Sequence, residues 1–408
     1  MNDDLIPVAE ARARLLADAG PLDAETIPLE DAQNRVLAED LTALRTQPPA
    51  AVSAMDGYAV KAADLENAPA VLTVIGEVAA GHPFDGAVGP GEAARIFTGG
   101  VVPAGADTVT MQENVTVLGD GKVRANQAEP LGRNIRAAGI DFEEGQTALE
   151  AGTLLDAGAL CLAAATNHPS LPVVRRPRVA VLATGDELLP PGSDPGPGQI
   201  IASNSFGVTA IARDCGADVI DLGIVPDRED ELAAALDRAA DAGCDVLVTL
   251  GGASVGDHDL VQKVFLARGM TLGFWKIAMR PGKPLMSGTL GAMRILGLPG
   301  NPVSALVCAH LFLKPLIESL AGRPFSERRV RAVLDSALPA NGRREDYMRA
   351  LAWRDETRTL RAKAFDRQDS SMIGAFARSN VLIVRPPQAP AAEKGDTVDA
   401  LVLKPHVL

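Results

Sequence analysis

The chain has 408 residues, of which 47% are apolar, enough for roughly two to four domains with their own cores. Its formal net charge of −13 argues against nucleic acid and anionic membranes as partners, because both repel an acidic protein. The four cysteines are far apart in sequence and form no Cys-x-x-Cys pair, so we expect neither a disulfide framework nor a structural zinc site.

The first part of the chain carries helical patterns and no export signal. No signal peptide opens it and no long uninterrupted apolar run predicts a membrane span, so we expect a cytoplasmic protein. Residues 7–19 and 29–38 have apolar side chains at helical spacing, and a third helix is predicted over 156–167, packed with the first two. These segments predict a discontinuous helical domain made of residues 1–47 and 140–176.

A β-rich domain is predicted as an insertion at residues 48–139, where Gly and Pro turns separate short apolar runs. The predicted strands cover residues 71–75, 93–97, 108–112, 115–118 and 122–125. Two loops carry polar candidates, Asp56 in Met-Asp-Gly-Tyr and Thr98 in Phe-Thr-Gly-Gly. From the residues alone, Asp56 is a turn aspartate that satisfies its own backbone, and Thr98 either contacts a phosphate or caps its turn.

Strand and helix patterns alternate from Arg178 onward, which predicts a parallel sheet covered by helices over residues 177–326. Strands are predicted at 179–184, 218–225 and 246–250, and helices at 204–214, 229–242, 259–269 and 302–320. Ligands bind at the carboxyl ends of strands in such sheets. The loops expected to converge there are Thr184-Gly-Asp-Glu, Val225-Pro-Asp and Gly251–Asp259, with the Pro- and Gly-rich loop 189–199 between them.

The turn Gly251-Gly-Ala-Ser-Val-Gly-Asp-His-Asp is typical of an anion site. Its glycines allow close backbone approach, and free N–H groups precede a helix start. It is not a P-loop, because Asp257-His258 stands where Lys-Ser/Thr is required. An ordinary βα turn is the alternative interpretation.

Three cations follow this turn within eight positions, namely Lys276, Arg280 and Lys283. Pro281 and Pro284 keep the segment from forming a regular helix, so the cations are expected on an irregular loop. In an acidic chain, such a local concentration of positive charge favours the binding of an anion, although a solvated basic loop is the simpler reading. The remaining residues, 327–408, predict a small β-barrel or sandwich with strands at 329–334, 348–352, 360–364, 381–384 and 397–403.

Several motifs together resemble the MoeA/gephyrin E-domain family, the molybdopterin molybdenumtransferases. They are Ser53-Ala-Met-Asp-Gly-Tyr-Ala-Val, Asn134-Ile-Arg-Ala-Ala-Gly-Ile-Asp, Gly251-Gly-Ala-Ser-Val-Gly-Asp, Arg280-Pro-Gly-Lys-Pro and Leu298-Pro-Gly-Asn-Pro-Val-Ser-Ala. Each is weak alone, but their joint order is specific and covers nearly the whole chain. The resemblance implies a multidomain α/β protein, with an adenylyltransferase-like sheet domain, a helical domain with its β-rich insertion, and a C-terminal β-barrel.

The resemblance also implies an activity and its residues. The expected reaction inserts molybdate into adenylylated molybdopterin, with Mg²⁺-dependent release of AMP. The residues expected in catalysis are Asp56, Thr98, Glu187, Asp227, Asp259 and Lys276. The residues expected to contact substrate are Arg136, Asp141, Gly251, Gly252, Ser254, Gly256, Arg280, Lys283, Pro299, Pro302, Arg349 and Ser370. The chain departs from the family pattern at Asp369, where glycine is usual, and at Gly374-Ala375, where serines are usual.

Carboxylates among phosphates make chemical sense mainly when a hard cation joins them, and Mg²⁺ prefers oxygen ligands. Glu187, Asp227 and Asp257 are therefore the candidate magnesium ligands. A carboxylate could instead act as a base toward water or a molybdate oxygen, or cap a helix.

Two other functions fit parts of the sequence. Pterin adenylylation suits the sheet domain, although the additional domains and the Met-Asp-Gly-Tyr motif argue against it. A scaffold that binds the cofactor without turnover is the second, although the complete set of polar motifs favours activity. The resemblance further implies a homodimer with sites shared between chains, and it makes a molybdopterin adenylyltransferase a candidate partner.

Overall fold

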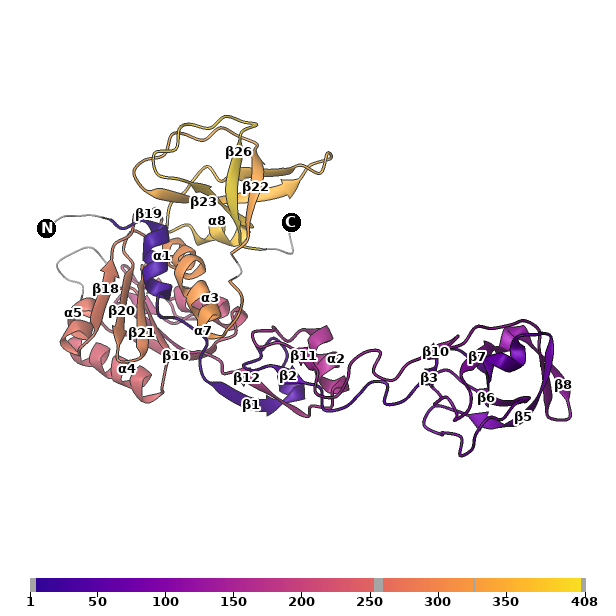
Figure 1. Ribbon diagram of the computed structural model, residues 1–408. Helices are drawn as coiled ribbons and strands as arrows, with labels where there is room; N and C mark the ends of the chain where they lie inside the picture. Colours follow the sequence, from indigo (N-terminus) through magenta and orange to yellow (C-terminus); the bar gives the residue numbers. More distant parts are fainter. Residues whose placement is uncertain (1–4, 253–259, 326, 405–408) are drawn as a thin grey trace. The chain divides into compact units, whose positions relative to one another are not determined.

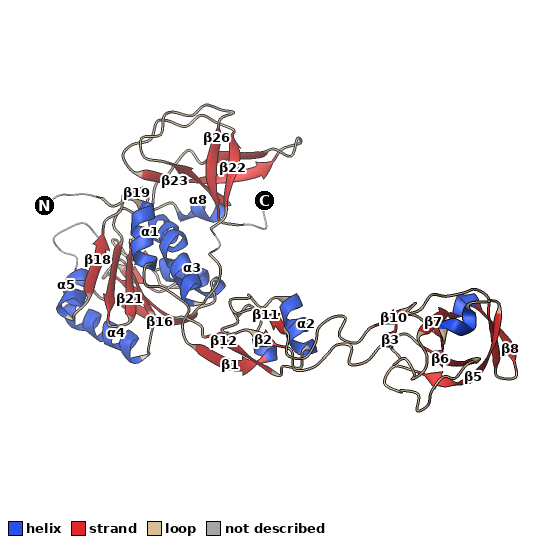
Figure 2. Ribbon diagram, viewed as in Figure 1, coloured by secondary structure: helices blue, strands red, loops and turns tan. Residues whose placement is uncertain are grey.

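A computed structural model of the protein describes residues 5–252, 260–325 and 327–404 (Figures 1 and 2). The chain forms two compact units. The larger unit contains Met1–Glu25 and Val174–Leu408, and the smaller contains Thr26–Val173.

The larger unit is built on a six-stranded sheet with the strand order β16-β13-β17-β21-β20-β18. Its strands are β13 (Arg178–Thr184), β16 (Asp218–Val225), β17 (Val246–Leu250), β18 (Thr271–Trp275), β20 (Met286–Leu290) and β21 (Met293–Leu298). The pairs β13–β16, β13–β17 and β17–β21 are parallel, which confirms the predicted parallel sheet. The antiparallel edge made by β20 and β18 has no counterpart in the sequence-based prediction.

Helices cover both faces of this sheet (Figure 2). One side carries α1 (Val8–Leu16), α3 (Asn204–Asp214), α6 (Pro302–Cys308) and α7 (Lys314–Leu320), and the other carries α4 (Glu229–Asp241) and α5 (Leu260–Ala267). Side chains of β13 alternate between the two cores: Val179 and Val181 join the first, Ala180 and Leu182 the second. All four are fully buried, as expected for a strand covered on both faces.

The N-terminal helix does not pack with the other helices predicted for a helical domain. Instead α1 contacts α7, and its buried Val8, Ala11 and Leu15 belong to the core of the larger sheet. The apolar face of α1 is thus covered by the apolar helices beside it. The predicted packing of α1 with residues 156–167 is therefore wrong.

The helix predicted over residues 29–38 is also wrong, since only a 3-10 turn, Leu29–Asp31, forms there. Asn34 adopts a positive φ of 60°, a conformation that an α-helix cannot continue through. The backbone beyond it bonds to residues 153–155 and 172: Leu37 N donates to Thr153 O, for example, at 3.0 Å. This part of the smaller unit therefore consists of short strands around the single helix α2 (Ala157–Ala165), which Asp156 caps.

The predicted β-rich region forms a six-stranded sheet within the smaller unit, with the strand order β7-β4-β6-β5-β9-β8. Its strands are β4 (Gly57–Val60), β5 (Ala70–Val78), β6 (Glu92–Ile96), β7 (Thr108–Met111), β8 (Val115–Gly119) and β9 (Lys122–Ala125). The shorter strands of the same unit are β1 (Ala24–Pro28), β2 (Leu41–Thr42), β3 (Val52–Ser53), β10 (Ile135–Arg136), β11 (Thr147–Leu149) and β12 (Ser170–Val174).

The C-terminal strands close into a barrel. They are β22 (Arg329–Leu334), β23 (Glu345–Arg354), β24 (Leu360–Ala364), β25 (Val381–Arg385) and β26 (Thr397–Val402). The pairs β23–β24, β24–β22, β22–β26, β26–β25 and β25–β23 complete the ring. The two-residue strand β19 (Met279–Arg280) joins the barrel strand β23 in parallel, and the short helix α8 (Ile373–Arg378) follows β24.

Pro302–Leu320 is long and apolar enough to cross a membrane, contrary to the expectation from the sequence, but 78% of it is buried inside the protein. It is a core helix, interrupted by the π-helical segment Ala309–Leu313. The ring of His310 in that segment lies 6.2 Å from the ring of Phe376 on α8, measured between centroids.

This histidine gives the fold a defined pH dependence. Burial, with help from Lys314, lowers the pKa of His310 from 6.5 to about 4. The unfolded chain therefore binds this proton more readily, so the contribution to stability is present above about pH 6.5 and is lost as the pH falls toward 4. Because the side chain is partly exposed, we expect the free energy of unfolding to fall by about 1–2 kcal/mol more in the wild type than in His310→Gln between about pH 7 and pH 5. Urea unfolding at several pH values measures this difference, and parallel curves for the two proteins would contradict it.

Candidate active site

A cavity of about 660 Å³ opens at the carboxyl ends of β13 and β17 and beside the turn after β21. The carboxylates of Glu187 and Asp227 are on residues of its wall, together with Gly251 and Gly252. Further walls come from Pro299–Pro302, from Ser203–Ser205 where α3 begins, and from Ser371 and Ile373 of the barrel. The strand-end loops that the sequence analysis predicts to converge do meet at this cavity.

Hydrogen bonds hold the two carboxylate-bearing loops in place. The Thr184 hydroxyl donates to the carboxylate of Asp227, and the Asp227 amide donates to Asp186 Oδ1 at 3.2 Å. Glu187 follows a turn at Gly185, whose φ is 150°. That φ favours glycine, and a Cβ at Gly185 would lie 2.4 Å from Glu187 Oε2, so any other residue there would displace this carboxylate.

The glycine turn starts on the cavity wall. Gly251 has a φ of 102°, and a Cβ there would meet the Thr184 carbonyl oxygen at 2.5 Å. At Gly252, with a φ of 62°, a Cβ would collide with Val261 at 2.2 Å. The backbone of this turn therefore lies so close to Thr184 and Val261 that both positions require glycine. The remaining predicted residues of this turn, Ser254, Gly256, Asp257 and Asp259, lie outside the described residues.

The Pro299–Pro302 turn ties three parts of the cavity together. Asn204 Nδ2, at the start of α3, donates to Gly300 O at 2.6 Å. Asn301 Nδ2 donates to Ser370 Oγ at 3.1 Å, and Val303 N donates to Ser370 O at 3.0 Å. Ser370 is thus placed by this turn, while Pro299 and Pro302 themselves line the cavity. The sequence analysis did not single out Asn204 or Asn301, although Asn301 stands inside the quoted Leu-Pro-Gly-Asn-Pro motif.

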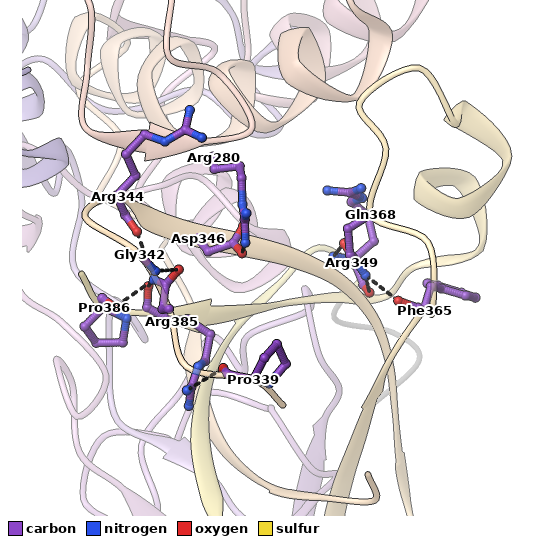
Figure 3. Close-up of polar contacts among 11 residues, drawn as sticks. Arg280, Pro339, Gly342, Arg344, Asp346, Arg349, Phe365, Gln368, Arg385 and Pro386 are labelled. Atoms are coloured by element: carbon purple, nitrogen blue, oxygen red, sulfur yellow. Dashed lines mark hydrogen bonds and ion pairs between the residues drawn. The ribbon is translucent and has the colours of Figure 1, made fainter. Parts of the chain in front are cut away.

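The predicted cations lie beside the cavity rather than among its described lining residues. Arg280 forms an ion pair with Asp346 of the barrel, as Figure 3 shows, and this bond raises the pKa of Arg280. The Lys276 ammonium stands 5.1 Å from the Trp275 ring centroid, on a backbone with a φ of 83°. Lys283 precedes Pro284 on the cavity wall. The sequence analysis predicted an irregular loop here, but part of the segment is regular, because β19 pairs with the barrel strand β23.

Arg349 lies on the outer face of the barrel strand β23, the face that carries Tyr347 of the sheet-domain core, and it is only 1% exposed. Its Nη2 donates to Asp369 O at 3.2 Å, and its Nε has no hydrogen-bond partner among the described residues. Burial lowers the pKa of Arg349, while the charges of Asp346 and Asp369 act in the opposite direction. The family resemblance made Arg349 an expected substrate contact but gave no sign of this burial.

The smaller unit carries the other predicted residues. Asp56 Oδ1 accepts hydrogen bonds from Thr98 N at 2.7 Å and Thr98 Oγ1 at 2.8 Å, and these bonds lower the pKa of Asp56. The Asp56 carboxylate therefore accepts hydrogen bonds from a loop 42 positions away. The residues alone had suggested that it would bond to its own backbone. A Cβ at Gly57 would lie 2.0 Å from Thr110 O, which explains the glycine of the Met-Asp-Gly-Tyr motif.

Arg136 and Asp141 also belong to the smaller unit, and both are exposed. Arg136 is the second residue of β10, which pairs with β3 (Val52–Ser53). The Asp141 amide donates to Gln47 O at 3.1 Å. Arg136 is therefore held by β3 and Asp141 by Gln47, and both of these partners precede β4 in the chain.

Comparisons with known proteins match this arrangement along the chain. Family models cover residues 6–166 (MoeA N-terminal region, domain I and II), 180–319 (Probable molybdopterin binding domain) and 331–403 (MoeA C-terminal region, domain IV). A Haemophilus influenzae protein named molybdopterin molybdenumtransferase is 36% identical over 97% of this chain and 98% of its own length. A Bacillus subtilis protein of the same name is 35% identical over 98% of this chain and 94% of its own.

A solved structure agrees with the sequence matches. The molybdopterin biosynthesis MoeA protein from Pyrococcus horikoshii superposes with a TM-score of 0.86 and 28% identity, covering 98% of this chain and all of that one. The sheet domain, with the cavity at its strand ends and the barrel on one side of it, matches the molybdopterin-binding class of α/β proteins through the family model over residues 180–319. Within that class, the chain belongs to the MoeA family.

Proposed function

We propose that the chain is a molybdopterin molybdenumtransferase, which inserts molybdate into adenylylated molybdopterin and releases AMP at the cavity of the larger unit. The observation that carries this proposal is the meeting of Glu187, Asp227 and the Gly251-Gly252 turn on one cavity, in a chain that matches the family from end to end. Incubation with adenylylated molybdopterin, molybdate and Mg²⁺ should release AMP, and no release with all three present would refute the proposal.

The reaction must bring anions together at one site, and the chain offers three means of doing so. Glycines at the turn after β17 allow the backbone to approach a phosphate closely. Arg280 and Lys276 supply positive charge beside the cavity, and a guanidinium can bind a phosphate through two hydrogen bonds at once. Thr184 orients the carboxylate of Asp227. These groups offset the repulsion between the anionic substrates and hold the substrates in a defined orientation at the cavity.

Magnesium fits the donor set at this cavity. Mg²⁺ takes oxygen ligands and is commonly bound by one or two carboxylates together with substrate phosphates. Glu187 and Asp227 supply two such carboxylates, whereas the third predicted ligand, Asp257, lies outside the described residues. Within those residues, no group of three His, Cys, Asp or Glu side chains is placed to hold a metal, so the phosphates of the substrate would complete the shell. When bound, the ion would polarise the anhydride oxygens.

The same assay separates the two alternative functions. An adenylyltransferase would consume ATP and would not need molybdate. A scaffold would bind molybdopterin without releasing AMP. We propose the cytoplasm as the location, because the four cysteines, all unpaired, suit a reducing compartment.

We also propose that the active form is a homodimer in which Asp56 and Thr98 of one chain complete the cavity of the other, with a molybdopterin adenylyltransferase as a transient partner. The support is the family resemblance and the reciprocal geometry of a two-fold dimer. In addition, the partly exposed Asp56 and the exposed Thr98 are hydrogen-bonded to each other on the smaller unit, and neither is among the residues that line the cavity described above.

The cationic segment provides a test of substrate binding. Lys276→Ala and Arg280→Ala should each weaken binding of the adenylylated substrate by roughly tenfold to a hundredfold, the range expected for one charge-assisted hydrogen bond. Arg268→Ala removes a cation of α5's C-terminal turn that pairs with Asp237, and this control should bind normally. Affinity can be measured by calorimetry. Thermal melting should change little in Lys276→Ala, whereas Arg280→Ala removes the ion-pair partner of the buried Asp346 and should melt at a lower temperature. Equal affinity in all four proteins would show the segment to be a solvated surface.

A further inference from the structure

The loop between β24 and α8 carries an acidic residue for which the proposed reaction has no use. Asp369 is exposed, and an unpaired carboxylate there would repel anionic substrates. Its side chain is not unpaired, however. Asp369 Oδ1 accepts hydrogen bonds from Ser371 N at 2.8 Å and from Ser371 Oγ at 2.6 Å. The carboxylate is therefore turned onto the second residue after it, and these bonds lower the pKa of Asp369.

One end of this loop is fixed to the barrel. The Gln368 side chain accepts from Arg349 N at 2.9 Å and donates to Arg349 O at 3.0 Å, so that it pairs with both backbone groups of one residue (Figure 3). Gln368 Nε2 also donates to Phe365 O at 2.8 Å. The buried Arg349 guanidinium then donates to Asp369 O at 3.2 Å. The loop therefore leaves the barrel from a rigid point.

The other end of the loop meets the cavity. Ser370 is held by Asn301 and by the amide of Val303, both in the turn that enters α6. Ser371 and Ile373 lie on the cavity wall itself. Ser371 has no hydrogen bond to the sheet domain among the described residues. Its amide and its hydroxyl are both held by the Asp369 carboxylate.

We propose that Asp369 is a positioning residue for the transfer reaction, which fixes Ser371 on the cavity wall and so presets the barrel side of the substrate site. The inference rests on the proposed function. Without the carboxylate, Ser371 samples more conformations, and the substrate must order it on binding. Such a cost reduces affinity while leaving the chemical step largely intact.

The direction of the change in KM separates this role from simple repulsion: loss of a positioning residue raises KM, whereas loss of a repelling charge lowers it. Asp369→Ala removes both hydrogen bonds and the charge, and it should raise KM for the adenylylated substrate roughly threefold to tenfold with kcat within about twofold. Asp369→Asn keeps an oxygen acceptor and should restore KM to that of the wild type or below. Ser371→Ala loses one of the two bonds and should fall between them. Asp366→Ala removes an equal charge from the same loop and serves as the control, with kinetics like those of the wild type.

Three outcomes would overturn the proposal: an unchanged or lower KM in Asp369→Ala, an equal rise in Asp369→Ala and Asp369→Asn, or a loss of thermal stability that accounts for the defect. Hydrogen exchange supplies a readout independent of turnover, because the Ser371 amide should exchange faster in Asp369→Ala but not in Asp369→Asn. A wild-type protein that releases no AMP would refute the proposed function instead, and the exchange rates would then decide alone whether Asp369 fixes the loop.

Discussion

Glu187→Gln should reduce molybdate-dependent AMP release by about 100-fold or more, which corresponds to about 2.7 kcal/mol of transition-state stabilisation. The substitution keeps the size of the side chain and removes its charge. Glu187 lies on the cavity wall, and its loop is held by backbone bonds, with Ile200 N donating to Glu187 O at 2.8 Å. These backbone bonds do not depend on the carboxylate, so the fold and the thermal unfolding temperature should be preserved.

The form of the defect identifies the role of this carboxylate. A magnesium ligand lost from Glu187 should raise the Mg²⁺ concentration needed for half-maximal activity, and direct titration should show weaker binding of the ion. A lost general base should instead change the pH dependence of kcat while leaving the Mg²⁺ requirement unchanged. Glu10→Gln, on the exposed side of α1 where Glu10 pairs with Arg14, is the matched control and should behave as wild type. Full activity in Glu187→Gln would exclude both roles.

Local patterns in the sequence predicted most of the sheet domain and the barrel. Runs such as residues 179–184 and 246–250 are fully buried strands whose side chains enter both cores. The three strand-end loops were predicted to converge because parallel strands place their carboxyl ends on one edge. That topological rule, rather than any single motif, brings Glu187, Asp227 and Gly251 to one cavity.

The missed features depend on partners that are distant in sequence. The N-terminal helix has an amphipathic pattern, but nothing in that pattern says which apolar surface will cover it, and α7 does so from about 300 positions away. In the same way, the partner of Asp56 stands on the Thr98 loop, and Arg280 pairs with Asp346 on a barrel strand. The burial of Arg349 follows from the packing of the outer face of β23 against segments distant in sequence, which no local window of sequence contains.

The most informative experiment on assembly mixes two inactive chains. We expect Asp56→Ala and Glu187→Ala to be inactive alone and to regain activity when their subunits exchange. If each site combines the cavity of one chain with Asp56 of the other, a heterodimer contains one intact site and one with both defects. Random exchange at equal concentrations makes half of the dimers mixed, so activity should reach about a quarter of the wild-type value.

The alternative arrangement makes the opposite prediction. If Asp56 serves the Glu187 of its own chain, every site in the mixture carries a substitution, and activity should stay at the level of the separate variants. Different affinity tags on the two chains allow the heterodimer to be purified, which shows that exchange has taken place. Asp56→Asn provides a second pairing, because its amide oxygen can still accept from Thr98 and keep the loop in place. Purified heterodimers that remain inactive in both pairings would rule out a site shared between chains.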